Sequence, residues 1–142
     1  MLEIEGYASR FFVRDLNDDV VARGAFGASL ARTGPRGVKM LHQHEGAAPV
    51  GVWDEVREDA DGLFVRGRVL DVTPQGRMAA ALVRAGAVDG LSIGFRAVKA
   101  RGDESGRLRV LTEVELWEVS LVTFPMLPQA RIRRFAEARA AA

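Results

Sequence analysis

The sequence predicts a mainly β fold, a small and largely antiparallel β-barrel with two or three surrounding helices. Three observations support this prediction. Many short segments have the apolar content and spacing of strands, and turn signals such as Asp61-Gly62 separate them. Only two or three segments have helical character. Strands and helices do not alternate regularly, as they would in a parallel α/β fold.

The first half of the chain contains four predicted elements. Leu2 to Phe12 alternates apolar and polar residues and predicts a strand. Val20 to Arg32 predicts a short helix around residues 25–30, weakened by two glycines. Two further strands are predicted over Val38 to Gln43 and Pro49 to Arg57. The turn at Asp61-Gly62 then makes the second of these the first arm of a hairpin.

The second half begins with the other arm of that hairpin. Thr73-Pro74 indicates a helix start, because Thr73 can cap the helix and Pro74 occupies a position that needs no amide hydrogen. The remaining predicted elements are a strand over Leu63 to Leu70, the end of that helix near Gly86, a strand over Leu91 to Ala100, one long or broken strand over Arg107 to Phe124, and a helix over Gln129 to Ala142.

Composition limits the classes of function. A length of 142 residues fits one domain, which we place at residues 1–128, followed by a basic helix or arm at 129–142. The chain has no cysteine, which excludes disulfides, thiol catalysis and cysteine-based zinc sites. A net charge of +1 gives no global electrostatic case for binding nucleic acid or an acidic membrane. We see no signal peptide and no apolar run near the ~20 residues of a membrane span.

A serine lies between two glycines in Gly90-Leu91-Ser92-Ile93-Gly94, the G-x-S-x-G spacing of a nucleophilic serine. In α/β-hydrolases this motif joins a strand to a following helix, and the histidine comes later in the chain. Here a helix precedes Ser92, a strand follows it, and both histidines lie upstream. The α/β-hydrolase fold is therefore excluded. A turn with a hydroxyl bonded to backbone remains the alternative to a nucleophile.

The chain has two histidines, His42 and His44, at the end of a predicted strand. In a strand they would point to the same face. One of them is a candidate general base for Ser92, because imidazole exchanges a proton near neutral pH. Two alternatives remain open. The pair could bind a metal, which would need further ligands, or the rings could pack in a polar rim.

A carboxylate is the natural third member of such a site, since it fixes the tautomer of the histidine. Glu118 continues the apolar face formed by Val114 and Leu116, where a carboxylate is costly unless it is paired. A protonating histidine would be a suitable partner, and an arginine is the alternative. A bulge near Trp117 would exchange the faces and make Glu115 the candidate.

Several segments together resemble the prohead proteases of tailed phages, of the Hong Kong ninety-seven type. They occur in the family's order and span roughly residues 2 to 132. They are His42-Gln43-His44-Glu45, Pro49-Val50-Gly51-Val52-Trp53, Thr73-Pro74-Gln75-Gly76-Arg77, Asp89-Gly90-Leu91-Ser92-Ile93-Gly94-Phe95 and Glu118-Val119-Ser120-Leu121-Val122-Thr123-Phe124-Pro125, with Gly24-Ala25-Phe26 and Pro128-Gln129-Ala130-Arg131. Prophage remnants and gene transfer agents carry similar proteins.

The resemblance implies a serine endopeptidase with His44, Ser92 and Glu118 as its catalytic residues and no cofactor. It implies a fold similar to that of the herpesvirus assemblins, and it makes a dimer plausible. The expected partner is the major capsid protein precursor with its scaffolding segment, cleaved, together with the protease itself, inside the assembling prohead in the host cytoplasm.

A non-catalytic capsid-assembly module of the same fold is the alternative function. It would bind the scaffold segment by adding a strand to an exposed sheet edge. The C-terminal arginines at 131, 133, 134 and 139 could touch DNA or an acidic scaffold, but a solvated basic helix is the simpler interpretation. We therefore expect neither nucleic acid nor a membrane as a partner.

Overall fold

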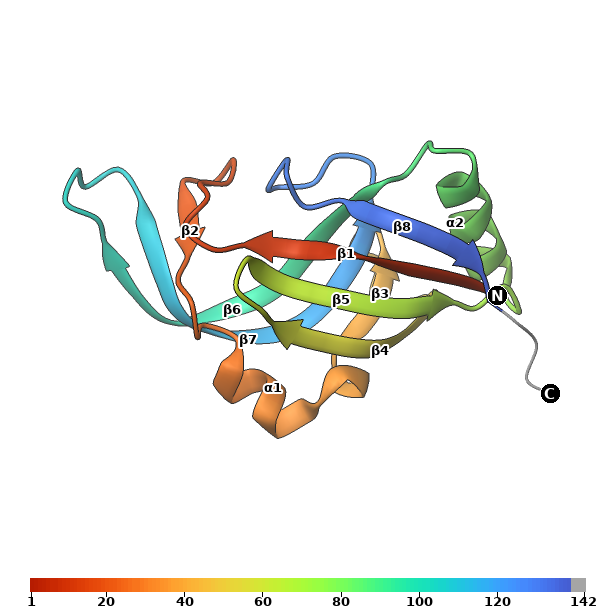
Figure 1. Ribbon diagram of the computed structural model, residues 1–142, viewed down its shortest axis with the longest axis horizontal. Helices are drawn as coiled ribbons and strands as arrows, with labels where there is room; N and C mark the ends of the chain where they lie inside the picture. Colours follow the sequence, from red (N-terminus) through yellow and green to blue (C-terminus); the bar gives the residue numbers. More distant parts are fainter. Residues whose placement is uncertain (139–142) are drawn as a thin grey trace.

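The computed structural model describes residues 1–138, which form eight strands and two α-helices (Figure 1). The strands are β1 Leu2–Arg10, β2 Asp19–Val21, β3 Lys39–His42, β4 Gly51–Glu58, β5 Gly62–Val69, β6 Gly90–Gly102, β7 Arg109–Val122 and β8 Ile132–Glu137. The helices are α1 Gly27–Thr33 and α2 Pro74–Arg84, with a 3₁₀ turn at Pro35–Gly37. Neither α-helix of the described part has the length and apolar character needed to cross a membrane.

All eight strands belong to one sheet, in the order β2-β7-β3-β4-β5-β1-β8, with β6 pairing to β7 outside this path. Most neighbours are antiparallel, and β7 has two parallel neighbours, β2 and β3. The mainly β, largely antiparallel prediction is confirmed. The sheet is not a closed barrel, however, because within residues 1–138 the order of paired strands ends at β2 on one side and at β8 on the other. Outside the named strands there are two isolated β-bridges, Phe11 to Val21 and Gly90 to Arg131, and they do not close the sheet.

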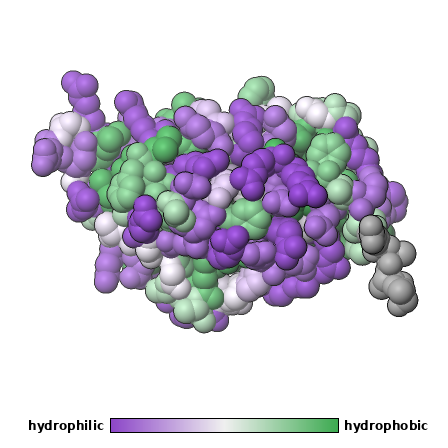
Figure 2. Space-filling view, in the orientation of Figure 1, coloured by the Kyte–Doolittle hydropathy of each residue, from purple (hydrophilic) through white to green (hydrophobic). Residues whose placement is uncertain are grey.

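The core lies inside the curved sheet. Leu2 and Ile4 of β1 point into it while Glu3 points outward, as the alternating sequence predicts. Trp53 of β4 is fully buried, and its indole nitrogen donates to the Val119 carbonyl of β7 at 3.3 Å. Hydrophilic side chains cover most of the face in Figure 2, with a hydrophobic patch at the left, over β2 and the base of the β6–β7 pair.

Helix α2 begins where Thr73-Pro74 predicts. The Thr73 hydroxyl accepts a hydrogen bond from the Gly76 amide at 3.0 Å, which satisfies one of the free amides of the first turn. Helix α1, Gly27–Thr33, overlaps its predicted region and ends one residue beyond it. The hairpin of β4 and β5 turns at residues 59–61, as expected, since the Asp59 carboxylate accepts from the amides of Asp61 and Gly62.

The helix predicted over residues 129–142 is wrong for residues 132–137, which form strand β8, and residues 139–142 lie outside the described residues. The free edge of β1 offers β8 a full antiparallel ladder, and this pairing outweighs the helical propensity of an Arg- and Ala-rich segment. Gly6 permits the approach, because a Cβ there would lie 2.1 Å from the Arg131 carbonyl oxygen.

Strand β2 was not predicted. Its three residues follow a loop rich in Asp and Asn, and they pair in parallel with Arg109, Val110 and Leu111 at the start of β7. Asp19 of β2 is buried and receives two hydrogen bonds from the Arg109 guanidinium, at 2.8 and 2.9 Å. A charge pair across two strands thus holds a segment that is too short for a periodic pattern to reveal.

Candidate active site

Ser92 is the third residue of β6, and its Cα pairs with that of Ser120 on β7. The preceding element is α2, so helix-before and strand-after, predicted from the sequence, are confirmed. Ser92 is 6% exposed. The serine therefore lies near the start of a long strand, where little of it is open to solvent.

The two glycines of the motif permit close packing. A Cβ on Gly94 would lie 2.6 Å from Oε2 of Glu118, and a Cβ on Gly90 would lie 2.7 Å from Cδ of Pro125. Neither glycine has a positive φ. The glycines thus serve close approach and not a positive-φ elbow.

His44 lies just beyond β3, in a turn where Gln43 and His44 both have positive φ, 54° and 61°. Such backbone costs of order 1–3 kcal/mol per residue, so its surroundings must hold it. The Gln43 amide donates to the Leu121 carbonyl, and the Gln43 side chain donates to the Thr123 hydroxyl at 2.7 Å. Because the strand ends before this turn, the expectation that His42 and His44 share one face of a strand is wrong.

The Nδ1 atom of His44 lies 2.6 Å from Oε2 of Glu118, although 74 residues separate them in the sequence. Glu118 is largely buried and the imidazole is about half exposed. A carboxylate at Nδ1 accepts the proton of that nitrogen and leaves Nε2 as the free acceptor of the ring. Nε2 of His44 is thus the ring nitrogen that is available to accept a proton, because Nδ1 is occupied by Glu118.

The bulge considered near Trp117 is present, because Gly94 pairs with Glu118 while the next residue, Phe95, pairs with Leu116. It does not make Glu115 the partner of the histidine. Glu115 lies on the outer face, where hydrogen bonds from the Trp117 indole and from Arg96, both at 2.8 Å, lower its pKa. Of the two candidates, Glu118 is the one that contacts His44.

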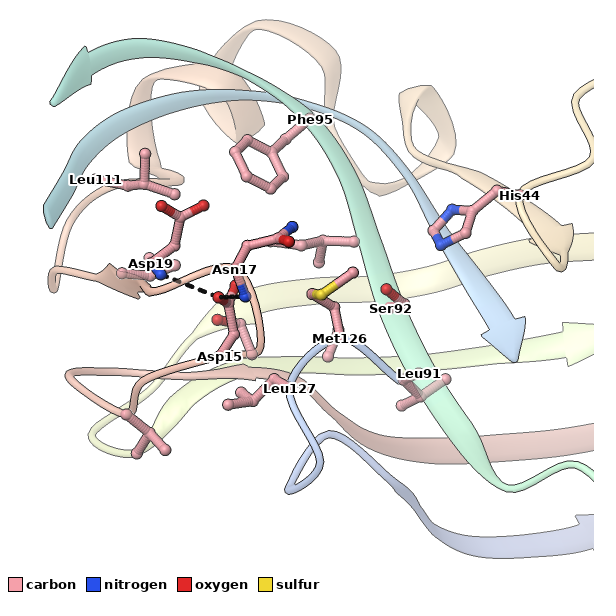
Figure 3. A pocket seen from close by; sticks show the side chains of 15 residues that line it. Asp15, Asn17, Asp19, His44, Leu91, Ser92, Phe95, Leu111, Met126 and Leu127 are labelled. Carbon is pink, nitrogen blue, oxygen red and sulfur yellow. Dashed lines mark hydrogen bonds between the residues drawn. The ribbon is translucent and has the colours of Figure 1, made fainter. Parts of the chain in front are cut away.

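His44 and Ser92 line one pocket of about 130 Å³ and lie toward the same end of it (Figure 3). No hydrogen bond joins their side chains among those of residues 1–138, so the hydroxyl is not yet aligned with the ring. The walls are mainly apolar, formed by Leu91, Phe95, Leu111, Met126 and Leu127 with neighbouring residues. Catalytic hydrogen bonds often tighten only when substrate is bound.

Carboxylates lie at the other end of the pocket. Asp15 accepts hydrogen bonds from the amides of Asn17 and Asp19, at 2.8 and 3.0 Å, and burial raises its pKa (Figure 3). Asp19 is already paired with Arg109. The pocket therefore combines an apolar wall, one serine–histidine end and one acidic end.

His42, the other candidate base, does not line this pocket. Its Nε2 atom is buried without a hydrogen-bond partner, and burial lowers the pKa of the ring. Within residues 1–138 no three His, Asp or Glu side chains gather as a metal would require. The structure thus separates the two histidines, and only His44 is placed beside Glu118 and Ser92.

Sequence reasoning missed one residue of the site, Ser120. This serine is fully buried, and its hydroxyl lies 2.8 Å from Oε1 of Glu118 and 3.0 Å from the His44 amide nitrogen. Its position two residues after Glu118, on the same apolar stretch, was the one available signal.

The fold is similar to that of viral proteases of known structure. The chain is similar to the capsid assembly protease of bacteriophage T4, with a TM-score of 0.68 and 17% identity over 84% of this chain and 80% of that one. It is also similar to the protease of Kaposi's sarcoma herpesvirus, with a TM-score of 0.62 and 12% identity over 96% of this chain and 65% of that one. These likenesses confirm the predicted herpesvirus protease-like fold.

The chain belongs to the caudovirus prohead serine protease family, whose model matches residues 1–141. It is 39% identical over 133 residues to the prohead protease of Enterobacteria phage HK97, covering 90% of this chain and 57% of that protein. The prohead protease of Escherichia phage T5 is 26% identical over 126 residues, covering 88% and 59%. The chain thus spans less than two thirds of the length of these relatives.

Proposed function

We propose that this protein is a serine endopeptidase of capsid maturation, acting inside the assembling prohead in the host cytoplasm. Its substrates are the scaffolding segment of the major capsid protein precursor and, in part, the protease itself. The observation that carries the proposal is the 2.6 Å contact between His44 and Glu118, in a pocket that Ser92 also lines. Membership of the prohead protease family supports it.

In the proposed mechanism Ser92 is the nucleophile. Its Oγ attacks the carbonyl carbon of the scissile peptide bond while the hydroxyl proton passes to Nε2 of His44. The imidazolium then gives that proton to the leaving amine as the C–N bond breaks. Water hydrolyses the acyl ester by the same route. Glu118 stays ionised, fixes the tautomer through Nδ1 and stabilises the imidazolium.

Co-expression with the capsid protein precursor tests this proposal. Ser92→Ala removes one oxygen from a site that Gly90 and Gly94 already shape, so the variant should fold and processing should stop. Mass spectrometry of the precursor locates the cut. Ser105→Ala is the matched control, because Ser105 lies in the exposed turn between β6 and β7 and bonds only locally. Processing that continued undiminished in the Ser92 variant would overturn the assignment.

The alternative, a non-catalytic module that binds the scaffold, is separated by a fluorophosphonate probe. In labelling, Ser92 Oγ displaces fluoride from phosphorus and its proton passes to His44. A peptidase becomes covalently modified at Ser92, which tandem mass spectrometry identifies. A binding module with an unactivated serine should not react.

A further inference from the structure

A fourth side chain joins Glu118 of β7 to the turn after β3 that carries His44. Ser120 on β7 is fully buried and lies between Glu118 and the turn that carries His44. Its hydroxyl donates to Oε1 of Glu118 at 2.8 Å and accepts from the His44 main-chain amide at 3.0 Å. One hydroxyl therefore touches both the acid and the backbone of the base.

These contacts give both carboxylate oxygens of Glu118 and the His44 amide a hydrogen-bond partner. Oε2 of Glu118 faces the imidazole, so Ser120 supplies the donor for the remaining oxygen. The His44 amide belongs to a residue with φ of 61°, a conformation that needs support. Since a hydroxyl has one proton, donation to Glu118 fixes its lone pairs toward His44.

We infer that Ser120 is a positioning residue for the proposed reaction. It keeps the Glu118 carboxylate aimed at Nδ1, and it holds the His44 turn so that Nε2 faces the pocket that Ser92 lines. Ser120 acts through these two residues and does not touch the substrate. The inference rests on the proposed peptidase function.

The surrounding charges do not replace this role. Asp15 and Asp19 lie at the other end of the pocket, and Asp19 is paired with Arg109. Lys39 pairs with Glu118 through its backbone, but its exposed ammonium reaches the Arg36 carbonyl at 3.5 Å. Among the described residues, only His44 and Ser120 form side-chain hydrogen bonds or ion pairs with the Glu118 carboxylate.

The test is the rate of Ser92 labelling by a fluorophosphonate, measured against pH. Ser120→Ala should label about ten- to a hundredfold more slowly, the effect of leaving buried polar groups without partners near the reacting atoms. It should also move the acid limb of the rate profile to higher pH. Without the Ser120 donor the carboxylate is less well stabilised, so the His44–Glu118 pair takes up a proton more readily.

Ser29→Ala is the matched control. Ser29 is also fully buried and accepts a hydrogen bond from a β7 amide, that of Leu116, at 2.9 Å, but it lies outside the pocket. Both alanine variants should lower the melting temperature, and only Ser120→Ala should move the acid limb. If Ser120→Ala does not fold, Ser120→Thr and Ser120→Cys are compared. The cysteine, a weaker donor, should label more slowly than the threonine.

The outcomes separate two failures. A wild-type protein that the probe never labels would overturn the proposed function and this role with it. A wild-type protein that is labelled, with Ser120→Ala reacting at the same rate and with the same acid limb, would overturn the role of Ser120 alone. A thiol variant as fast as the threonine variant would also contradict it.

Discussion

The two halves of the β6–β7 pair share one ladder but differ in their surroundings. In the site half, residues 90–94 and 118–122, β7 lies between β6 and β3, and each of its five residues is buried. In the hairpin half, residues 97–102 and 109–114, β6 is mostly exposed and the pair extends away from the body at the left of Figure 1. The same secondary structure thus serves a packed site at one end and a solvated arm at the other.

Buried and solvated polar groups differ in which partners can satisfy them. In the site half Ser120 and Glu118 are buried, so protein groups must satisfy their polar atoms. In the hairpin half Lys99 pairs with Glu113 on the surface, where solvent can substitute. Equivalent substitutions in the two halves should therefore have very different effects.

The largest effect is expected from Glu118→Gln. The amide would present a donor to Nδ1 of His44 and favour the wrong tautomer, so peptidase activity should fall about a hundredfold or more. Glu115→Gln, the same change three residues away on the exposed face, should leave activity nearly unchanged. Initial rates of capsid precursor cleavage measure both. Equal losses in the two variants would contradict the assignment of Glu118.

The next effect compares two glycines of β6. Gly94→Ala places a Cβ 2.6 Å from the Glu118 carboxylate, which should cost about 1–3 kcal/mol of unfolding free energy and also displace Glu118. Gly102→Ala meets nothing within 4 Å and should change stability by less than about 0.5 kcal/mol. Urea denaturation measures both, and a tolerant Gly94 would show that the site half is not tightly packed.

A smaller effect concerns His42, the last residue of β3, which pairs with Leu121 in the site half. Burial lowers its pKa below the ordinary 6.5, so the unfolded chain binds a proton more readily than the folded one. The stability contributed by the neutral ring is complete above pH 6.5 and is lost as pH falls below it. His42→Gln should remove this part of the acid sensitivity. Denaturation at several pH values should show that the difference in unfolding free energy between wild type and variant shrinks only in acid.

The smallest effect is expected in the hairpin half. Lys99→Gln removes an exposed ion pair with Glu113, whose charged atoms are 3.7 Å apart. The unfolding free energy should change by less than about 0.5 kcal/mol, because exposed pairs contribute little. Activity should be unaffected. A loss comparable to that of Gly94→Ala would show that the two halves are coupled more strongly than their burial indicates.

The sequence predicts the parts of this molecule that depend on local patterns. Alternation in β1, the Thr73-Pro74 cap and the Asp61-Gly62 turn each determine structure over a few residues. Strand β8 was predicted as a helix because its conformation depends on the distant edge of β1. Strand β2 was missed for the same reason, since its pairing with β7 spans about ninety residues.

The residues of the candidate site also divide into those that a local pattern predicts and those that distant contacts place. The glycines around Ser92 are readable because they form a compact motif, and Glu118 is conspicuous as an acid on an apolar face. The turn at Gln43 and His44 has left-handed backbone without a glycine, so no local residue type predicts it. Contacts with Leu121 and Thr123 hold its geometry. No local pattern distinguishes Ser120, because its contact with the His44 turn forms only in the folded chain. The roles of His44, Ser92 and Glu118 stay predictions until the variants are measured.

The parallel pairing of β3 with β7 also sets the order in which the site can be assembled. Ser92 and His44 leave the ribosome before Glu118, and β3 cannot pair with residues 118–121 until nearly the whole domain has been synthesised. Long-range parallel contacts are among the slowest to form during folding. The His44–Glu118 contact is therefore a late event, and a nascent chain that carries the serine and the base still lacks the acid that would orient them.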